Sequence, residues 1–99
     1  AEVFERLKSS GKNVFAATDG VDHESLIAPA EAGAHPDPHV WMDAALWSRC
    51  VGHVEAKLAE FDPAHADEYH ARAEAYRKEV AALDEYVRTV IASVPVRQR

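Results

Sequence analysis

Cysteine is nearly absent from this sequence, and this limits the disulfide, metal and redox chemistry that the chain can support. A single cysteine, Cys50, among 99 residues excludes an internal disulfide and every CxxC metal or redox motif. No apolar run comes near the roughly 20 residues of a membrane span, and no basic stretch precedes an apolar segment. The printed sequence therefore predicts neither a transmembrane helix nor a signal peptide, and any export signal is expected outside this stretch.

Basic side chains are too few and too scattered for a nucleic-acid-binding protein. The 17 acidic residues outnumber the 11 Lys and Arg, the net charge is -6, and basic residues gather only at Arg97 and Arg99. Phosphate binding needs clustered Lys and Arg. An HExxH pair, a Gly-rich phosphate loop and a nucleophile elbow are also missing. We therefore expect no nucleic-acid partner and no enzymatic activity.

The first twenty residues indicate the end of a helix followed by one strand. Residues 3–7 place three apolar side chains at helical spacing, and Gly11 is a typical C-terminal stop. The apolar run 14–18, closed by Asp19-Gly20, predicts a strand buried on both faces. One strand cannot satisfy its own backbone groups. We therefore predict part of an α/β fold that is here mainly α with one short strand.

A loop is expected over residues 21–38, which show no sustained hydrophobic period apart from one helical turn near 24–27. Residues 35–39 read His-Pro-Asp-Pro-His. Each proline removes a hydrogen-bond donor and pushes the preceding residue toward extended geometry. We expect this pentapeptide to be rigid and extended.

Two helices are predicted after this loop. Asp43 is the expected N-cap of a helix whose apolar stripe ends near Phe61. Asp62-Pro63 starts the next helix at once, so the two meet at a sharp corner. The third helix is expected to run from about 63 to 93, before Pro95. Its apolar seam consists of Tyr69, Ala73, Tyr76, Val80, Leu83, Val87 and Val90.

Six histidines are present, and one of them stands in a setting that suits metal binding. His53, His65 and His70 lie on predicted helices without metal-ligand spacing, so we interpret them as structural. His39 follows a proline and precedes the apolar run 40–42, which predicts an imidazole held against a hydrophobic shell. His39 is therefore the main candidate metal ligand.

His35, at the other end of the pentapeptide, is the weaker candidate. A site inside the chain that combines His23, His35, Asp37 and His39 is geometrically possible, but no known zinc-ligand spacing supports it.

The segment His35–Asp43, HPDPHVWMD, resembles the D-P-H-x-W-x-D signature of the metal-binding solute-binding proteins of ABC transporters, the cluster A-I zinc and manganese receptors. The segments on either side of this motif resemble the same family. Residues 11–21 are similar to the last strands of that family's N-lobe and the turn after them, and residues 62–95 to its long helix between two lobes. The resemblance covers essentially the whole chain.

That family has two α/β lobes joined by one long helix, with the metal held between the lobes by four side chains. The resemblance implies that residues 1–62 are the C-terminal part of the N-lobe, 63–95 the linker helix, and 96–99 the start of the connection to the C-lobe. His39 matches the motif histidine and would be one ligand of the four. The other three are expected outside this chain, so we expect an incomplete receptor.

The resemblance also implies Zn²⁺ or Mn²⁺ as the transported ligand and an ABC permease as partner. The implied location is periplasmic or extracellular, with a lipid anchor in a preceding segment as one option. The stretch Glu31–His35 before the motif is short and holds one histidine. This favours the mixed zinc and manganese type over receptors dedicated to zinc, which often carry a long His-rich loop there.

The alternative hypothesis is a helical interaction module, in which the seam pairs with another helix and His39 is incidental. Residues 37–43 separate the two hypotheses, because such a module has no use for the signature. Under either hypothesis, the unpaired strand and the apolar seam predict that the isolated chain self-associates.

Overall fold

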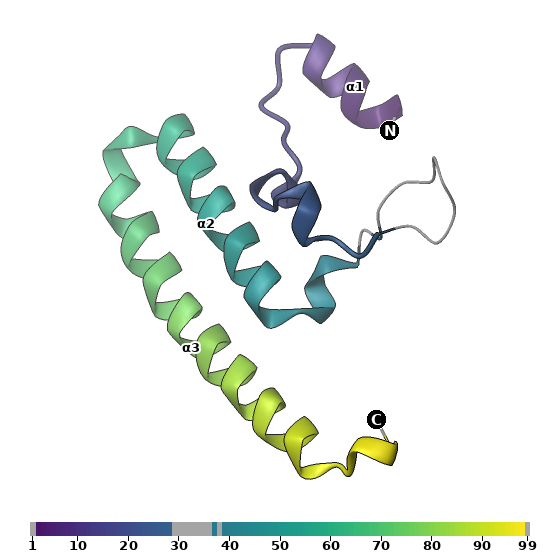
Figure 1. The fold of residues 1–99 in the computed structure, drawn as a ribbon. Coiled ribbons are helices and arrows are strands. Elements are labelled where there is room, and N and C mark those ends of the chain that lie inside the picture. Colours follow the sequence, from purple (N-terminus) through teal and green to yellow (C-terminus); the bar gives the residue numbers. More distant parts are fainter. Residues whose placement is uncertain (1, 29–36, 38, 99) are drawn as a thin grey trace.

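Helices dominate the chain, as predicted. The computed structural model describes residues 2–28, 37 and 39–98. Over these residues the helices are α1 (Glu2–Ser9), α2 (Ala44–Phe61) and α3 (Ala66–Ser93), with 3₁₀ turns η1 (Ala17–Gly20), η2 (His23–Ser25), η3 (Val40–Met42), η4 (Pro63–His65) and η5 (Val96–Gln98). Helices α2 and α3 lie side by side and antiparallel, and α3 projects past the start of α2 (Figure 1).

The predicted strand at residues 14–18 is wrong. Residues 12–16 have no regular secondary structure, and the chain turns into η1 at Ala17. The Asp19 amide donates to the Ala16 carbonyl at 3.0 Å, and the Ala16 amide donates to the Asp19 carboxylate at 3.3 Å. These bonds close a turn. A strand would need a partner, and the part of the chain that the structure describes contains no second strand.

The predicted ends of the first two helices are confirmed. Gly11 follows α1 with a φ of 76°, a left-handed conformation that favours glycine at a helix end. The side chain of Asp43 accepts a hydrogen bond from the Leu46 amide at 3.0 Å, which is the expected N-cap. One helical turn, η2 at His23–Ser25, lies in the loop close to the predicted position.

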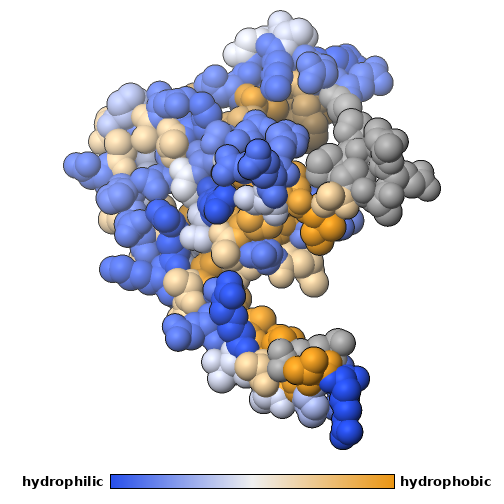
Figure 2. Space-filling model, in the orientation of Figure 1, coloured by the Kyte–Doolittle hydropathy of each residue, from blue (hydrophilic) through white to orange (hydrophobic). Residues whose placement is uncertain are grey.

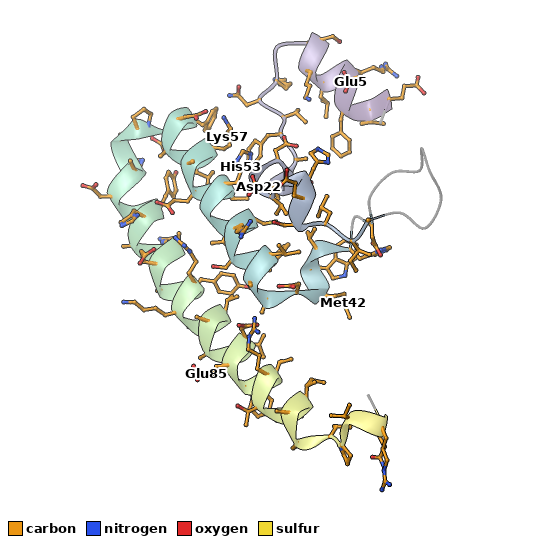
Figure 3. The ribbon with its side chains drawn as sticks, viewed as in Figure 1. Glu5, Asp22, Met42, His53, Lys57 and Glu85 are labelled. Carbon is orange, nitrogen blue, oxygen red and sulfur yellow. The ribbon has the colours of Figure 1, made fainter. Side chains whose placement is uncertain are left out.

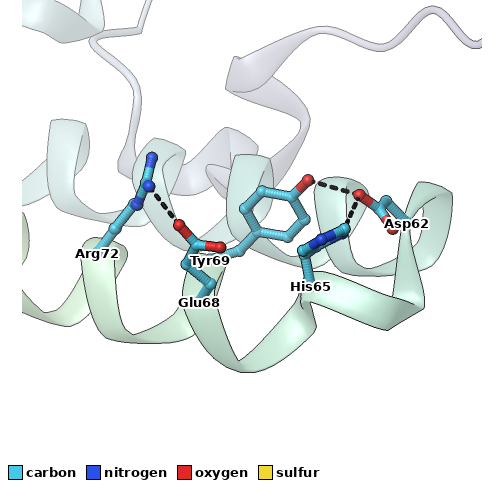
Figure 4. Close-up of polar contacts among 5 residues, drawn as sticks. All are labelled: Asp62, His65, Glu68, Tyr69 and Arg72. Atoms are coloured by element: carbon cyan, nitrogen blue, oxygen red, sulfur yellow. Dashed lines mark hydrogen bonds and ion pairs between the residues drawn. The ribbon is translucent and has the colours of Figure 1, made fainter.

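Asp62 organises the corner between α2 and α3 (Figure 4). Its Oδ2 lies 2.8 Å from Nδ1 of His65 and accepts a hydrogen bond from the Tyr69 hydroxyl at 2.9 Å. The Tyr69 bond and then the His65 bond lower the pKa of the Asp62 carboxyl. Pro63 is the first residue of η4, so the chain turns where the sequence predicted and continues directly into α3.

The apolar core is small. The buried apolar residues among those described are Val21, Val40, Cys50, Ala73 and Val80. The radius of gyration is 17.1 Å, against about 13 Å for a compact domain of this size. Much apolar surface therefore stays exposed.

The seam of α3 is buried only where α2 covers it. Ala73 and Val80 are 8% and 5% exposed, whereas Leu83, Val87 and Val90 are 53%, 45% and 42% exposed. The indole of Trp47 on α2 donates to the Tyr76 hydroxyl at 3.1 Å within the covered half. Figure 2 shows apolar surface on the projecting part of α3. No helix among the described residues has the length and apolarity to cross a bilayer.

Candidate metal site at the Asp37–Asp43 motif

Val40, in the middle of the motif, anchors it to the core. Its side chain is 3% exposed and packs with Val21 and Cys50, which are 6% and 1% exposed. The partly buried residues around this cluster are Ala17, Leu26, Leu46 and Trp47. Since the residue next to His39 is fixed in the core, the backbone that carries the imidazole is fixed as well.

Asp37 contacts His39 twice with one oxygen. Oδ1 of Asp37 accepts a hydrogen bond from the His39 amide at 2.9 Å and also contacts Nδ1 of the His39 ring. The backbone bond, followed by the ring bond, lowers the pKa of the Asp37 carboxyl. The carboxylate is therefore held in its ionised form beside the imidazole.

Trp41 borders the other side of the His39 ring. The two rings meet edge to face, with their centroids 4.9 Å apart and an angle of 74° between their planes. The His39 side chain nevertheless remains 60% exposed. Within the described residues its Nε2 has no hydrogen-bond partner, so no described side chain competes with a ligand for this nitrogen.

The last part of the motif builds the start of α2. The Met42 amide donates to the His39 carbonyl at 3.3 Å, and the Asp43 amide donates to the Val40 carbonyl at 3.1 Å. The Asp43 side chain then caps α2, as described above. Met42 is 82% exposed and lies just before the start of α2 (Figure 3).

Among the described residues, the donors around His39 do not make up a complete metal site. Across residues 2–28, 37 and 39–98, no group of three or more His, Cys, Asp or Glu side chains is placed to hold a metal ion. His35, the weaker candidate, lies outside the described residues, as does most of the predicted rigid pentapeptide. The internal site that includes His35 accordingly stays untested.

The helical histidines each have a local contact. His65 pairs with Asp62, and Nδ1 of His70 lies 2.7 Å from Oε1 of Glu55. His53 meets Phe15 edge to face at 5.7 Å, and its buried Nε2 has no partner among the described residues. These contacts agree with the interpretation of the three as structural.

Sequence reasoning singled out His39 but missed the role of Asp37, which it considered only as a further donor. The signal that could have revealed it is the Asp-x-His spacing. An Asp side chain readily reaches the backbone amide two residues on, and here it also reaches the ring.

Known proteins match this chain along its whole length. The family model described as ZnuA, zinc-uptake complex component A, periplasmic, matches residues 1–99. The chain belongs to the ZnuA family. Its resemblance to metal-binding solute-binding proteins is thereby confirmed at the family level.

Individual relatives of this ZnuA-family chain carry the names of three different metals. It is 34% identical over 88 residues to the manganese-binding lipoprotein MntA of Bacillus subtilis, covering 89% of this chain and 28% of the relative. It is 35% identical over 98 residues to the zinc-binding protein TroA of Treponema pallidum, covering 99% of this chain and 31% of that relative. It is 35% identical over 63 residues to the iron-binding protein YfeA of Yersinia pestis, covering 64% of this chain and 20% of that relative.

The fold agrees with a solved structure. The structure of the Treponema pallidum periplasmic zinc-binding protein TroA matches with a TM-score of 0.86 and 35% identity, over 96% of this chain and 33% of that one. The chain therefore spans about a third of the length of the relatives it matches most fully.

Proposed function

We propose that this chain is part of an extracytoplasmic receptor that binds a divalent transition metal, zinc or manganese, for import by an ABC permease. The observation that carries the proposal is the state of His39. Its Nδ1 is contacted by Asp37, its Nε2 has no hydrogen-bond partner among the described residues, its side chain is 60% exposed, and its backbone is anchored by the neighbouring Val40. An imidazole fixed in this way is prepared for a metal before the metal arrives.

In this proposal His39 is one ligand of four. Residues 1–62 belong to an N-lobe, 63–95 form the linker helix, and 96–99 begin the connection to a C-lobe that supplies further ligands. The long α3 helix and the coverage of a third of the TroA structure support this assignment. The role is binding and transport; the names of the family and its relatives describe uptake and metal binding rather than a reaction.

The metal is proposed as zinc or manganese because both names occur among relatives of similar identity. A neutral imidazole suits zinc, and added carboxylates favour manganese. His39 alone does not select between them, whereas the short stretch before the motif favours the mixed type. The family description and the lipoprotein name of one relative support a periplasmic or otherwise extracytoplasmic location, with a lipid anchor as one option.

The test is a chimera in which these 99 residues replace the matching third of the Treponema pallidum protein. Zn²⁺ and Mn²⁺ are titrated by calorimetry into the chimera, its His39→Ala variant and a His23→Ala control. His23 is exposed and lies in η2, outside the motif. We expect the chimera to bind metal tightly, His39→Ala to lose that binding, and His23→Ala to keep it. Unchanged binding in a folded His39→Ala chimera would overturn the proposal.

We also propose that the 99-residue chain self-associates on its own. Only one of the two features that predicted this remains, since the strand is absent from the described residues. The exposed half of the seam, Leu83, Val87 and Val90, supports the proposal, because apolar side chains aligned on one helix face favour burial against a partner.

A further inference from the structure

We propose that Asp37 is a positioning residue, which holds His39 in the tautomer that carries its proton on Nδ1 and so presents the Nε2 lone pair to the metal. This inference rests on the proposed function and adds to it the identity of the ligating nitrogen and the group that selects it.

The hydrogen-bond chemistry of Asp37 and His39 determines which ring nitrogen carries the proton. An ionised carboxylate can only accept hydrogen bonds, and a neutral imidazole has one nitrogen that donates and one that accepts. Since Oδ1 of Asp37 contacts Nδ1 of His39, the shared proton belongs to the imidazole nitrogen. Nε2 of the neutral ring is then bare, and only a bare nitrogen binds a metal ion.

Asp37 is held in place by the backbone of the same histidine whose ring it contacts, which distinguishes this pair from that of Asp62 and His65. The oxygen that contacts the ring also accepts the His39 amide at 2.9 Å, and the Asp37 amide donates to the Ile27 carbonyl at 3.2 Å. The carboxylate is therefore tied to the backbone of the residue it orients. Rotation of the carboxylate away from the ring would break the bond to the amide as well.

Trp41 restricts the ring from a second direction through its edge-to-face contact. A half-turn of the ring about its Cβ–Cγ bond would put Cδ2 where Nδ1 lies and break the contact with Asp37, while the indole limits tilting of the ring. The His39 side chain as a whole remains 60% exposed.

The pair of Asp62 and His65 provides a matched control. Nδ1 of His65 lies 2.8 Å from the Asp62 carboxylate, so it has the same ring contact. No bond from the Asp62 carboxylate to the His65 amide accompanies it, and the pair lies at the other end of α2 from the motif.

The experiment is long-range ¹H–¹⁵N NMR on the chain labelled with ¹⁵N-histidine, at about pH 8.5, which is roughly two units above the ordinary pKa of histidine. The samples are the wild type and the variants Asp37→Ala, Asp37→Asn and Asp62→Ala. We expect a protonated Nδ1 on His39 in the wild type, its loss in Asp37→Ala, and substantial retention in Asp37→Asn, whose amide oxygen still accepts both bonds. Asp62→Ala should change His65 and leave His39 unaltered.

Zn²⁺ affinity of the chimera is the second readout. Asp37→Ala is expected to weaken binding by about 10- to 100-fold, as with other groups that orient a metal-ligating histidine, and Asp37→Asn by less. A wild-type His39 protonated on Nε2, or a tautomer that is the same in wild type and Asp37→Ala, overturns the inference even if affinity falls.

The two proposals fail in different ways. If His39→Ala leaves Zn²⁺ affinity unchanged, the proposed function is wrong, whatever the tautomer. If His39→Ala abolishes binding while Asp37→Ala changes neither tautomer nor affinity, the proposed function stands and this inference alone is wrong.

Discussion

The two aspartates of the motif have different partners and different consequences. Asp37 contacts the imidazole of His39, whereas Asp43 accepts the Leu46 amide at 3.0 Å and starts α2. At the scale of single residues, the motif therefore combines the proposed metal ligand with a signal that starts a helix.

Asp43→Ala should destabilise the chain by about 1 kcal/mol, because it removes the N-cap acceptor of α2. Urea denaturation followed by far-UV circular dichroism measures the change. Asp43→Asn, which keeps a side-chain acceptor, should retain most of the stability. Equal midpoints for wild type and Asp43→Ala would show that the cap contributes nothing.

His70 should make the stability of the α2–α3 pair depend on pH. The hydrogen bond and then the charge of Glu55 raise the pKa of His70 above its ordinary value of 6.5. A raised pKa means that the fold favours the protonated ring. The stabilisation is therefore fully present below about pH 6.5, and it disappears as the pH rises through the raised pKa of His70.

NMR titration of His70 and urea midpoints on both sides of that range test this expectation. Glu55→Gln should lower the pKa of His70 and flatten the pH dependence. Glu60→Gln, which removes a carboxylate of the same helix that bonds Lys57 instead, should leave the pKa of His70 unaltered. The same His70 pKa in wild type and Glu55→Gln would contradict the assignment.

At the scale of elements, η1 packs against α2 through a glycine. A Cβ at Gly20 would lie 2.5 Å from the Cβ of His53 and 3.2 Å from the Arg49 carbonyl. His53 is labelled on α2 in Figure 3. The close approach of these two segments therefore depends on the missing side chain.

Gly20→Ala should cost about 1–3 kcal/mol, since the added methyl group forces η1 away from α2. Gly52→Ala is the matched control, because a Cβ there has nothing within 4 Å. Inside α2, that change should stabilise by about 0.5–1 kcal/mol. Thermal unfolding measures the stability of both variants. A Gly20→Ala variant as stable as wild type would mean that η1 and α2 can move apart without cost.

The helix boundaries were predictable because their signals are local. Asp43 as a cap and Pro63 at the corner act on backbone groups within one turn of themselves, so neighbouring residues contain the information. The strand at 14–18 could not be judged in this way. An apolar run becomes a strand only when another segment supplies the ladder, and that depends on residues distant in sequence.

The candidate site was predictable to a similar extent. The motif identified His39 from its immediate neighbours, but the choice between its two ring nitrogens required the position of the Asp37 oxygen. The burial of Val40 also required the fold, because its neighbours in the core, Val21 and Cys50, come from other parts of the chain.

At the scale of the whole molecule, the main feature is the length of α3 that α2 does not cover. The helical period of the sequence predicted the seam, but not where its burial ends. Val80 is 5% exposed and Leu83 is 53% exposed, so the boundary falls within one turn. Beyond it, the apolar side chains of the seam are about half exposed.

Val87→Glu should reduce self-association, because it places a charge in the exposed half of the seam. Thr89→Glu adds the same charge on a different side of α3 and should have little effect. Size-exclusion chromatography with light scattering, over a range of concentrations, gives the mass of each. A wild-type chain that is monomeric throughout, or equal masses for both variants, would contradict the proposed use of this face.

The position of Val40 has a consequence for genetics. Under the proposed function, we expect a screen for metal uptake to record a substitution that enlarges or polarises this side chain as a loss of binding, although Val40 offers the metal no donor atom. Its effect would pass through the backbone to His39 on one side and to the start of α2 on the other. A map of such uptake-defective alleles should therefore extend inward from the motif to Val21 and Cys50, which pack against Val40.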